Sequence, residues 1–475
     1  MSESKHFTTA PEDKINLYQK FAYGFGALVN NLLGQAIPMM AIVLNLGLGM
    51  NPALVGTLMA LPRLTDALTD PLMGYISDNT RSRWGRRKPF IFFGAIFAGI
   101  LYAAMWQLPE GHSEMFYFWF FLIGSILFYL GYTIFATPWV ALGYELTPDY
   151  HERTRVLGTA NAMGQVVWIV LPWFYAFMEN DRFFESSVQG ARSLAIMIGV
   201  FVILVGVLPA LLTKERLKDL PSAKGEGSLI THVIDFFKGL LKTVKNKAFV
   251  LLCAATFLVF NGYQLVASFT SYVLIYYVYG GDKDLGATLM GAFGTFMAVS
   301  TFAVILLVTW VATKLGKKKT FFISISISLF GYGLKWFCYS PEHPYLILVC
   351  APFVAFGLGC LFTLMGSMIA DVCDVDELET GERREGMFGS IFWWVVKLGM
   401  AFVMLLSGFA LNATGFDVAL EGNQSEQTLF LMRLFDVGVP FATSALAILV
   451  VYLYPITEER AHEVREELEA RRGQV

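Results

Sequence analysis

The sequence predicts an all-α, polytopic membrane protein with twelve transmembrane helices in two six-helix pseudo-repeats. Its composition, its long apolar segments and the alternating charge of its connections support this prediction. Of the 475 residues, 56% are hydrophobic and 15% are charged. Soluble domains carry roughly 25% charged residues. The depletion of charge is therefore typical of a chain that lies mostly in a lipid bilayer.

Twelve segments contain the ~20 predominantly apolar residues that a helix needs to cross a bilayer. In chain order they are residues 21–46, 53–77, 89–108, 115–145, 157–178, 193–213, 247–278, 285–313, 320–339, 345–371, 386–411 and 430–454.

The connections between these segments alternate in charge. Lys and Arg gather after the second, fourth, sixth, eighth and tenth segments, whereas the connections at 47–52, 109–114 and 340–344 contain none. By the positive-inside rule, the basic connections and both termini are cytoplasmic. The first twenty residues are polar, so we expect the first transmembrane helix to direct insertion without a cleavable signal peptide.

These patterns divide the chain into five expected regions. They are a cytoplasmic N-terminal segment at 1–20, an N-terminal six-helix half at 21–213, a cytoplasmic central loop at 214–246, a C-terminal six-helix half at 247–454 and a cytoplasmic tail at 455–475. In the central loop, apolar residues at helical spacing with lysines opposite them predict an amphipathic helix on the membrane surface over 228–245. The tail alternates acidic and basic residues, and we expect it to be a solvated helix or disordered.

The second apolar segment contains charged residues. Arg63, Asp66 and Asp70 are three and four residues apart, so a helix places them on one face. A carboxylate in hydrocarbon costs roughly 2.5–3.5 kcal/mol on insertion scales, so such residues normally face a cavity or a partner. Thr69 adds a hydroxyl oxygen beside them. The pattern indicates a cation or proton site within the membrane; the alternative is an ion-pair network with Arg63 that only holds helices together.

A loop motif follows the same segment. Gly74-x-x-x-Asp78 is followed by Arg83-x-Gly85-Arg86-Arg87, and this pattern resembles the loop signature of the major facilitator superfamily. A glycine inside a basic cluster recurs at the matching place of the second half, in VATKLGKKKT. The resemblance implies the major facilitator fold, with a substrate cavity between two six-helix halves. We expect Asp78 and the arginines to pair across helix ends and to latch one conformation.

A closer resemblance extends over nearly the whole chain. The sequence resembles the glycoside–pentoside–hexuronide:cation symporters, the melibiose permease-like family. The motifs that carry it are Tyr23-Gly-Phe-Gly-Ala27, Asp66-Ala-Leu-Thr-Asp70-Pro-Leu-Met-Gly74, Thr80-Arg-Ser-Arg-Trp-Gly85, Tyr132-Thr-Ile, and Asp371-Val-Cys-Asp374 leading to Val395-Val-Lys397. The family couples uphill sugar entry to downhill Na⁺, Li⁺ or H⁺.

The resemblance also implies site residues. The family's cation site corresponds to Asp66, Thr69, Asp70 and Thr133, where Na⁺ would bind the two carboxylates. Its intramembrane lysine corresponds to Lys397, which we expect to lie across the cavity from them.

The substrate side departs from the family pattern. In melibiose permease, acidic residues on helices one and four and an arginine on helix five hold the sugar hydroxyls. Asn31, Ala136 and Asn161 stand at these positions here. Charge-assisted hydrogen bonds are about twice as strong as neutral ones, so α-galactosides should not be recognised in the same way. The candidate substrate-binding residues are Asn31, Arg63, Tyr132, Asn161, Trp393 and Lys397.

We therefore expect secondary active transport by alternating access, with uptake of a glucoside, pentoside or uronide coupled to Na⁺ or H⁺. The alternative is a lysolipid or other amphiphile symporter of the same fold. The sequence contains no HExxH, GxSxG or phosphate-cradling motif, so we expect no enzyme and no cofactor beyond the coupling ion. We expect a monomer in the bacterial inner membrane, with the sugar, the cation and the bilayer as partners and no nucleic acid.

Overall fold

The computed structural model describes residues 11–147, 149–215, 243–381 and 385–472, and helices dominate these ranges. The chain divides into two compact units: unit 1 comprises Met1–Val43 and Leu61–Leu229, and unit 2 comprises Leu44–Ala60 and Ile230–Val475. The short segment Leu44–Ala60 thus groups with unit 2, although it lies within the predicted N-terminal half. The predicted amphipathic helix falls almost entirely on residues outside the described ranges.

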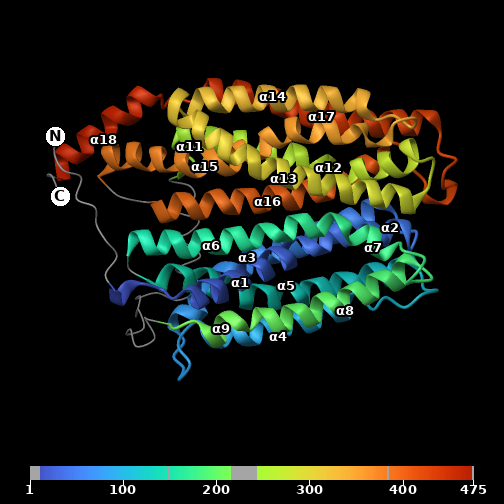
Figure 1. Ribbon diagram of the computed structural model, residues 1–475, viewed down its shortest axis with the longest axis horizontal. Coiled ribbons are helices and arrows are strands. Elements are labelled where there is room, and N and C mark those ends of the chain that lie inside the picture. The colour runs from blue at the N-terminus through green and yellow to red at the C-terminus, as the bar shows by residue number, and fades with distance from the viewer. Residues whose placement is uncertain (1–10, 148, 216–242, 382–384, 473–475) are drawn as a thin grey trace. The chain divides into compact units, whose positions relative to one another are not determined.

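Unit 1 is built from long helices joined by short turns. Its elements are η1 (Pro11–Asp13), α1 (Leu17–Met40), most of α3 (Pro52–Asn79), α4 (Lys88–Met105), α5 (Glu114–Glu145), α6 (Tyr150–Val170), η2 (Leu171–Trp173), α7 (Phe174–Met178), α8 (Ser187–Gly206) and α9 (Leu208–Leu212). In Figure 1 the long helices of this unit, coloured blue to green, run in nearly the same direction. The short helix α2 (Ile42–Leu46) links α1 to α3.

Unit 2 has a similar construction and contains two π-helical turns. Its elements are α11 (Lys247–Thr256), η3 (Phe257–Asn261), α12 (Gly262–Tyr272), η4 (Val273–Val278), α13 (Lys283–Leu315), α14 (Lys317–Cys338), η5 (Pro344–Cys350), α15 (Ala351–Thr380), α16 (Glu385–Ala413), η6 (Val418–Leu420), α17 (Glu426–Tyr452) and α18 (Glu458–Arg472). The π-helical turns are η3 and η4, both within the seventh predicted segment.

The predicted all-α polytopic fold is confirmed. Among the described residues, eleven helical stretches are long and apolar enough to cross a membrane. The remaining predicted segment is α3, whose 28 residues exceed the ~20 needed to cross the bilayer. Four charged residues, Arg63, Asp66, Asp70 and Asp78, lower its hydropathy. The helix that the composition marks least clearly is therefore the one that carries the candidate site.

Glycines let the helices of unit 1 approach closely. Helix α4 packs against α5 and α8. A Cβ atom on Gly99 would lie 2.6 Å from the carbonyl oxygen of Gly199, and one on Gly199 would lie 2.5 Å from that of Gly99. Small residues that allow such backbone contact are the usual means of helix association in membranes, where lipid offers no hydrophobic driving force.

The C-terminal helix α18 is only partly solvated. It packs against α15, and Val464 and Leu468 on it are 0% and 5% exposed. The prediction of a solvated or disordered tail is wrong for this face, because two apolar side chains four residues apart form a stripe that the surrounding charges obscure in the sequence.

A buried ion pair in unit 2 joins three helices. Lys335 of α14 contacts Asp436 of α17 with 2.8 Å between Nζ and Oδ2, and the two residues are 5% and 0% exposed. Thr270 of α12 accepts a hydrogen bond from Lys335 over 2.8 Å and donates one to Asp436 over 2.8 Å. Tyr339 also donates to the carboxylate. Each charge is thus compensated, and the cluster ties α12, α14 and α17 together.

We expect removal of one member of this pair to cost more stability than removal of both. Lys335→Met or Asp436→Leu should each destabilise by about 3–5 kcal/mol, because an uncompensated buried charge remains, whereas the double variant should retain near-native stability. The thermal unfolding midpoint in detergent measures this. A double variant as unstable as the sum of the single variants would contradict the expectation.

Candidate cation and substrate site

Helices α3 and α5 bring three of the predicted cation ligands together. The Thr133 hydroxyl donates to Oδ1 of Asp70 over 3.3 Å, and its oxygen lies 3.3 Å from the hydroxyl oxygen of Thr69. Thr133 is 2% exposed, whereas Thr69 and Asp70 are half-buried. Asp66 lies one turn earlier on α3, and its side chain falls outside the described part of the structure.

Thr137 is a further oxygen donor that the sequence did not indicate. It follows Thr133 by four residues on α5 and therefore lies on the same face of the helix. Its hydroxyl donates to the same Oδ1 of Asp70 over 3.3 Å. A single threonine in an apolar helix more often bonds its own backbone. Only its position one turn after Thr133 could have marked it.

The geometry around Asp70 suits a monovalent cation. Hydrogen bonds between hydroxyls and oxygen acceptors usually measure about 2.7–2.8 Å, so the 3.3 Å distances at Asp70 are loose. Carboxylate and hydroxyl oxygens are the ligands that hard cations prefer. A proton on the carboxylate would neutralise the same charge. The arrangement can therefore accommodate either Na⁺ or H⁺.

Arg63 is buried one helical turn before Asp66 and two turns before Asp70. It is 7% exposed, and its guanidinium donates to the backbone carbonyl of Gly34 on α1. The guanidinium carbon also lies 5.1 Å from the centre of the Tyr129 ring on α5. These contacts join α3 to α1 and α5, so Arg63 contributes to packing as well as to charge.

The predicted polar residues of α1, α5 and α6 have different surroundings. The Tyr132 hydroxyl donates to Oδ1 of Asn30 over 3.0 Å, which adds Asn30 to the polar residues expected from sequence. The amide of Asn31 donates to the carbonyl of Gly164 over 3.1 Å. Asn161 is exposed and accepts a long hydrogen bond of 3.4 Å from Gln165. Asn161 is thus the more available group, while Tyr132 is bonded to α1 and Asn31 holds α1 to α6.

Two candidate substrate residues lie on α16 in unit 2. The Trp393 ring is 60% exposed, and Lys397 is half-buried one turn further along the helix. Lys397 was predicted to lie across the cavity from Asp66 and Asp70. These residues belong to different units, so this placement stays a prediction.

Asn261 of unit 2 has an unusual environment. It ends the π-helical turn η3, and it is 2% exposed. Among the described residues, neither its amide nitrogen nor its amide oxygen has a hydrogen-bond partner. A Cβ atom on Gly399 of α16 would lie 2.5 Å from this nitrogen, so the amide fits against a residue without a side chain. Gly399 follows Lys397 by two residues on α16, so the amide and the predicted lysine lie at different faces of that helix.

The predicted latch arginines bind an unexpected carboxylate. Arg86 and Arg87 contact Oε1 of Glu145, at the end of α5, over 2.9 and 2.8 Å. Arg87 also donates to the hydroxyl of Ser77 on α3 over 2.6 Å. Arg83 is exposed, and the side chain of Asp78 falls outside the described part. The loop therefore ties the ends of α3, α4 and α5 together within unit 1.

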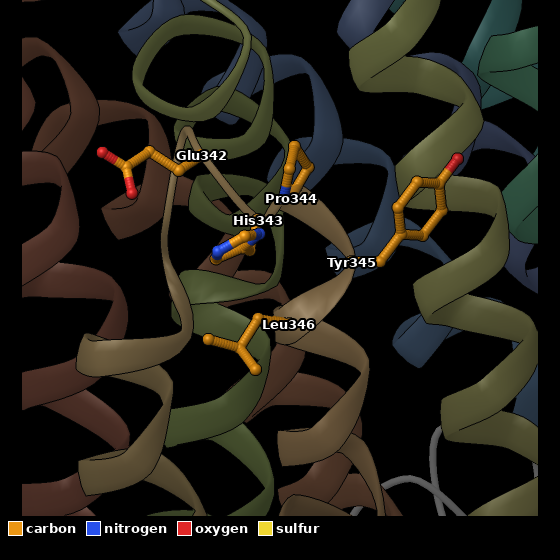
Figure 2. Close-up of a pocket in the computed structure, with 5 residues that line it drawn as sticks. All are labelled: Glu342, His343, Pro344, Tyr345 and Leu346. Atoms are coloured by element: carbon orange, nitrogen blue, oxygen red, sulfur yellow. The ribbon is translucent and has the colours of Figure 1, made fainter.

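A surface hollow of about 320 Å³ lies over the turn between α14 and α15. Figure 2 shows the side chains of Glu342 and Tyr345 pointing away from one another. All of its lining residues belong to the segment Glu342–Leu346. Polar groups from different elements do not converge there, so this hollow lacks the features of a functional site.

Comparisons with known proteins agree on one family. The profile of a family described as MFS/sugar transport protein matches residues 22–458. The isoprimeverose transporter of Lactiplantibacillus pentosus is 26% identical, with 84% of this chain and 81% of that protein covered. The glucuronide carrier protein homolog of Escherichia coli (strain K12) is 25% identical, with 89% of each covered.

A solved structure shares the fold. An inward-facing bacterial homolog of the human lysosomal transporter Spinster superposes with a TM-score of 0.67 at 16% sequence identity, covering 98% of this chain and 100% of that one.

We expect Asn261→Leu to raise the stability of the protein. Leu has the same number and branching of side-chain heavy atoms as Asn, and each buried polar group without a partner costs about 1–3 kcal/mol. The thermal unfolding midpoint in detergent measures the change, and Asn423→Leu, at an exposed asparagine, serves as control. A lower midpoint for Asn261→Leu would show that the amide has a stabilising partner.

Proposed function

Because the chain belongs to the MFS/sugar transport protein family, the glycoside–pentoside–hexuronide symporters, we propose that it couples uptake of a sugar or glycoside to downhill entry of Na⁺ or H⁺. The family consists of multi-pass membrane transporters and not of enzymes. The substrate class that we propose is a glucoside, pentoside or uronide. The protein would act as a monomer in the bacterial inner membrane, with both termini cytoplasmic.

The observation that carries this proposal is the oxygen cluster around Asp70. A half-buried carboxylate in a membrane-spanning helix is expensive, and here it receives hydroxyls from Thr133 and Thr137 on a second helix. Thr69 adds a third hydroxyl. Carboxylate and hydroxyl oxygens gathered at one point are the ligands that a hard monovalent cation prefers.

We propose that Asp66 and Asp70 share one coupling cation. They lie one helical turn apart, so two negative charges would repel one another unless a cation or a proton came between them. Thr69 and Thr133 would complete the coordination of Na⁺, and Thr137 would hold the Asp70 carboxylate in place. Binding of the ion would remove the repulsion and so favour a different conformation.

The proposed sugar site combines amides, aromatic rings and two cations. Tyr132, Asn31 and Asn161 supply hydrogen-bonding groups, and Trp393 offers an exposed ring on which a sugar face could stack. Arg63 and Lys397 carry positive charge that would favour a uronide. The names of the two relatives, an isoprimeverose transporter and a glucuronide carrier homolog, support both a pentoside and a uronide.

Coupling would follow from a shared conformational equilibrium. If cation and sugar each bind better to one orientation of the two halves, both together shift the equilibrium by the sum of their differential affinities. The contacts of Arg86 and Arg87 with Glu145 would stabilise one orientation, together with Asp78 and Arg83. Neither relative named above is described as a lysolipid carrier, so the amphiphile alternative gains no support.

The first test is sugar-driven ion movement in cells that lack their own carriers. Glucosides, pentosides, galactosides and uronides are added in turn while external Na⁺ and H⁺ are recorded. We expect one of the proposed classes to drive uptake of one ion, and Asp70→Asn to reduce that uptake at least tenfold because it removes the charge. Asp181→Asn, at an exposed aspartate, is the matched control. A preference for galactosides, or unchanged coupling in Asp70→Asn, would contradict the proposal.

The threonines allow a finer test. Thr133→Val removes one hydroxyl without changing the side-chain volume, and we expect the half-saturating concentration of the coupling ion to rise about tenfold, the equivalent of one hydrogen bond of about 1.4 kcal/mol. Thr137→Val should cause a smaller rise, since its hydroxyl acts through Asp70. Ion titrations of sugar uptake measure both. If the half-saturating ion concentration is the same in both variants and in the unmodified protein, the threonines do not belong to the ion site.

A further inference from the structure

We propose that unit 1 carries a binding site for the phosphate-bearing headgroup of an anionic phospholipid, where α4 begins and α9 ends. A cavity of about 440 Å³ lies at this place. It is separate from the Asp70 cluster, and the proposal does not depend on which solute is transported. Its lining residues are Arg83, Trp84, Lys88, Ala210, Leu211, Thr213, Lys214 and Glu215.

Three cations converge on the cavity. Arg83 and Lys214 are exposed, and Lys88 is half-buried. The ammonium of Lys88 donates to the carbonyl of Thr213 over 2.8 Å, which aims the side chain across the gap between α4 and the end of α9. An ammonium group has three N–H donors, so this contact leaves donors for an anion. The cations come from two segments that are far apart in sequence, which is typical of a built site.

The carboxylate of Glu215 does not cancel this charge. Its oxygens accept hydrogen bonds from the backbone N–H groups of Arg86, over 2.7 Å, and Arg87, over 3.2 Å. It therefore caps the N-terminus of α4, where the helix dipole is positive. Gly85 makes this possible: its φ is +114°, and a Cβ atom there would lie 2.1 Å from Oε2 of Glu215. Glu215 keeps its negative charge, but the three cations that line the cavity outnumber it, so the cavity retains a net positive charge.

The apolar lining distinguishes a lipid from a free anion. Trp84 and Leu211 are each 54% exposed, although both are large and apolar. They lie next to the ends of the spans Lys88–Met105 and Ser187–Leu212, where the hydrocarbon meets the headgroups. Tryptophan is enriched at this depth. A free phosphate would use only the cations, whereas a phospholipid would use the cations for its headgroup and Trp84 and Leu211 for its glycerol and acyl chains.

The position of the cavity gives the lipid a structural role. Basic pockets between transmembrane helices on the cytoplasmic side are typical sites for anionic headgroups. The turn that lines this one also contains Arg86 and Arg87, whose side chains hold Glu145 on α5. A bound headgroup would offset part of the positive charge of Arg83 and Lys88 on either side of these arginines. It would therefore stabilise the junction of α3, α4 and α5.

The test compares lipid binding by the full-length protein and two variants of equal charge. The purified protein is titrated with phosphatidylglycerol, phosphatidylcholine or inorganic phosphate, and bound lipid is counted by native mass spectrometry. We expect phosphatidylglycerol to bind at least tenfold more tightly than phosphatidylcholine. The double variant Lys88→Gln/Lys214→Gln should lose this preference, whereas Lys245→Gln/Lys319→Gln, at two exposed lysines of unit 2, should keep it.

Further measurements distinguish a phospholipid from free phosphate as the ligand of the cavity. Lys214→Glu alone tests the same site through an exposed residue, so a folding defect in the double variant does not obscure the result. Trp84→Ala should weaken phosphatidylglycerol binding without creating phosphate binding. Equal preference in the unmodified protein and the pocket variants would overturn the proposal. So would displacement of the lipid by millimolar phosphate, or lipid binding that begins only after cleavage within 216–242, since that segment would then be the occupant.

Discussion

A charged side chain is costly inside a bilayer, and this cost constrains the polar interior of the protein. The two units surround their intramembrane carboxylates with different partners. In unit 2, Asp436 has a lysine, a threonine and a tyrosine as partners, so the charge is compensated by fixed groups. In unit 1, Asp70 receives hydrogen bonds from two threonine hydroxyls at 3.3 Å. Carboxylate and hydroxyl oxygens together are the ligands that a hard cation prefers. The hydroxyls at Asp70 therefore support the proposed cation site, whereas the Asp436 cluster ties three helices together.

The sequence predicted the helices and the charged face of α3 because both depend on local patterns. Spacings of three and four residues place side chains on one face of any helix, and apolar runs of about 20 residues indicate membrane spans. The partners on other helices could not be found in this way. Thr133 was expected only from the family resemblance, and Thr137 and Asn30 were missed because an isolated polar residue in an apolar helix shows no periodicity. Lys335 and Asp436 were missed because they lie 101 positions apart and pair only through tertiary packing.

The loop after α3 illustrates how one short motif serves several purposes. The sequence predicted that its arginines pair with Asp78, a pairing that stays a prediction, and the structure adds Glu145 and Ser77 as partners of Arg86 and Arg87. Their backbone N–H groups meanwhile bind Glu215, which the sequence pattern did not single out. Gly85 has a backbone conformation that favours glycine and lies against this carboxylate. The glycine in the motif is therefore explained by the close approach of Glu215, and the arginines by helix-end charge.

Asn261 is a buried polar residue whose amide has no hydrogen-bond partner among the described residues. An apolar side chain would fill the same space at lower cost, so packing alone does not account for an amide there. The residue ends a π-helical turn, and such turns occur frequently at functional sites because they change the direction of side chains locally. The facing helix has a glycine at the point of contact, which leaves room for the amide. Packing and hydrogen bonding among the described residues therefore do not account for an asparagine at this position.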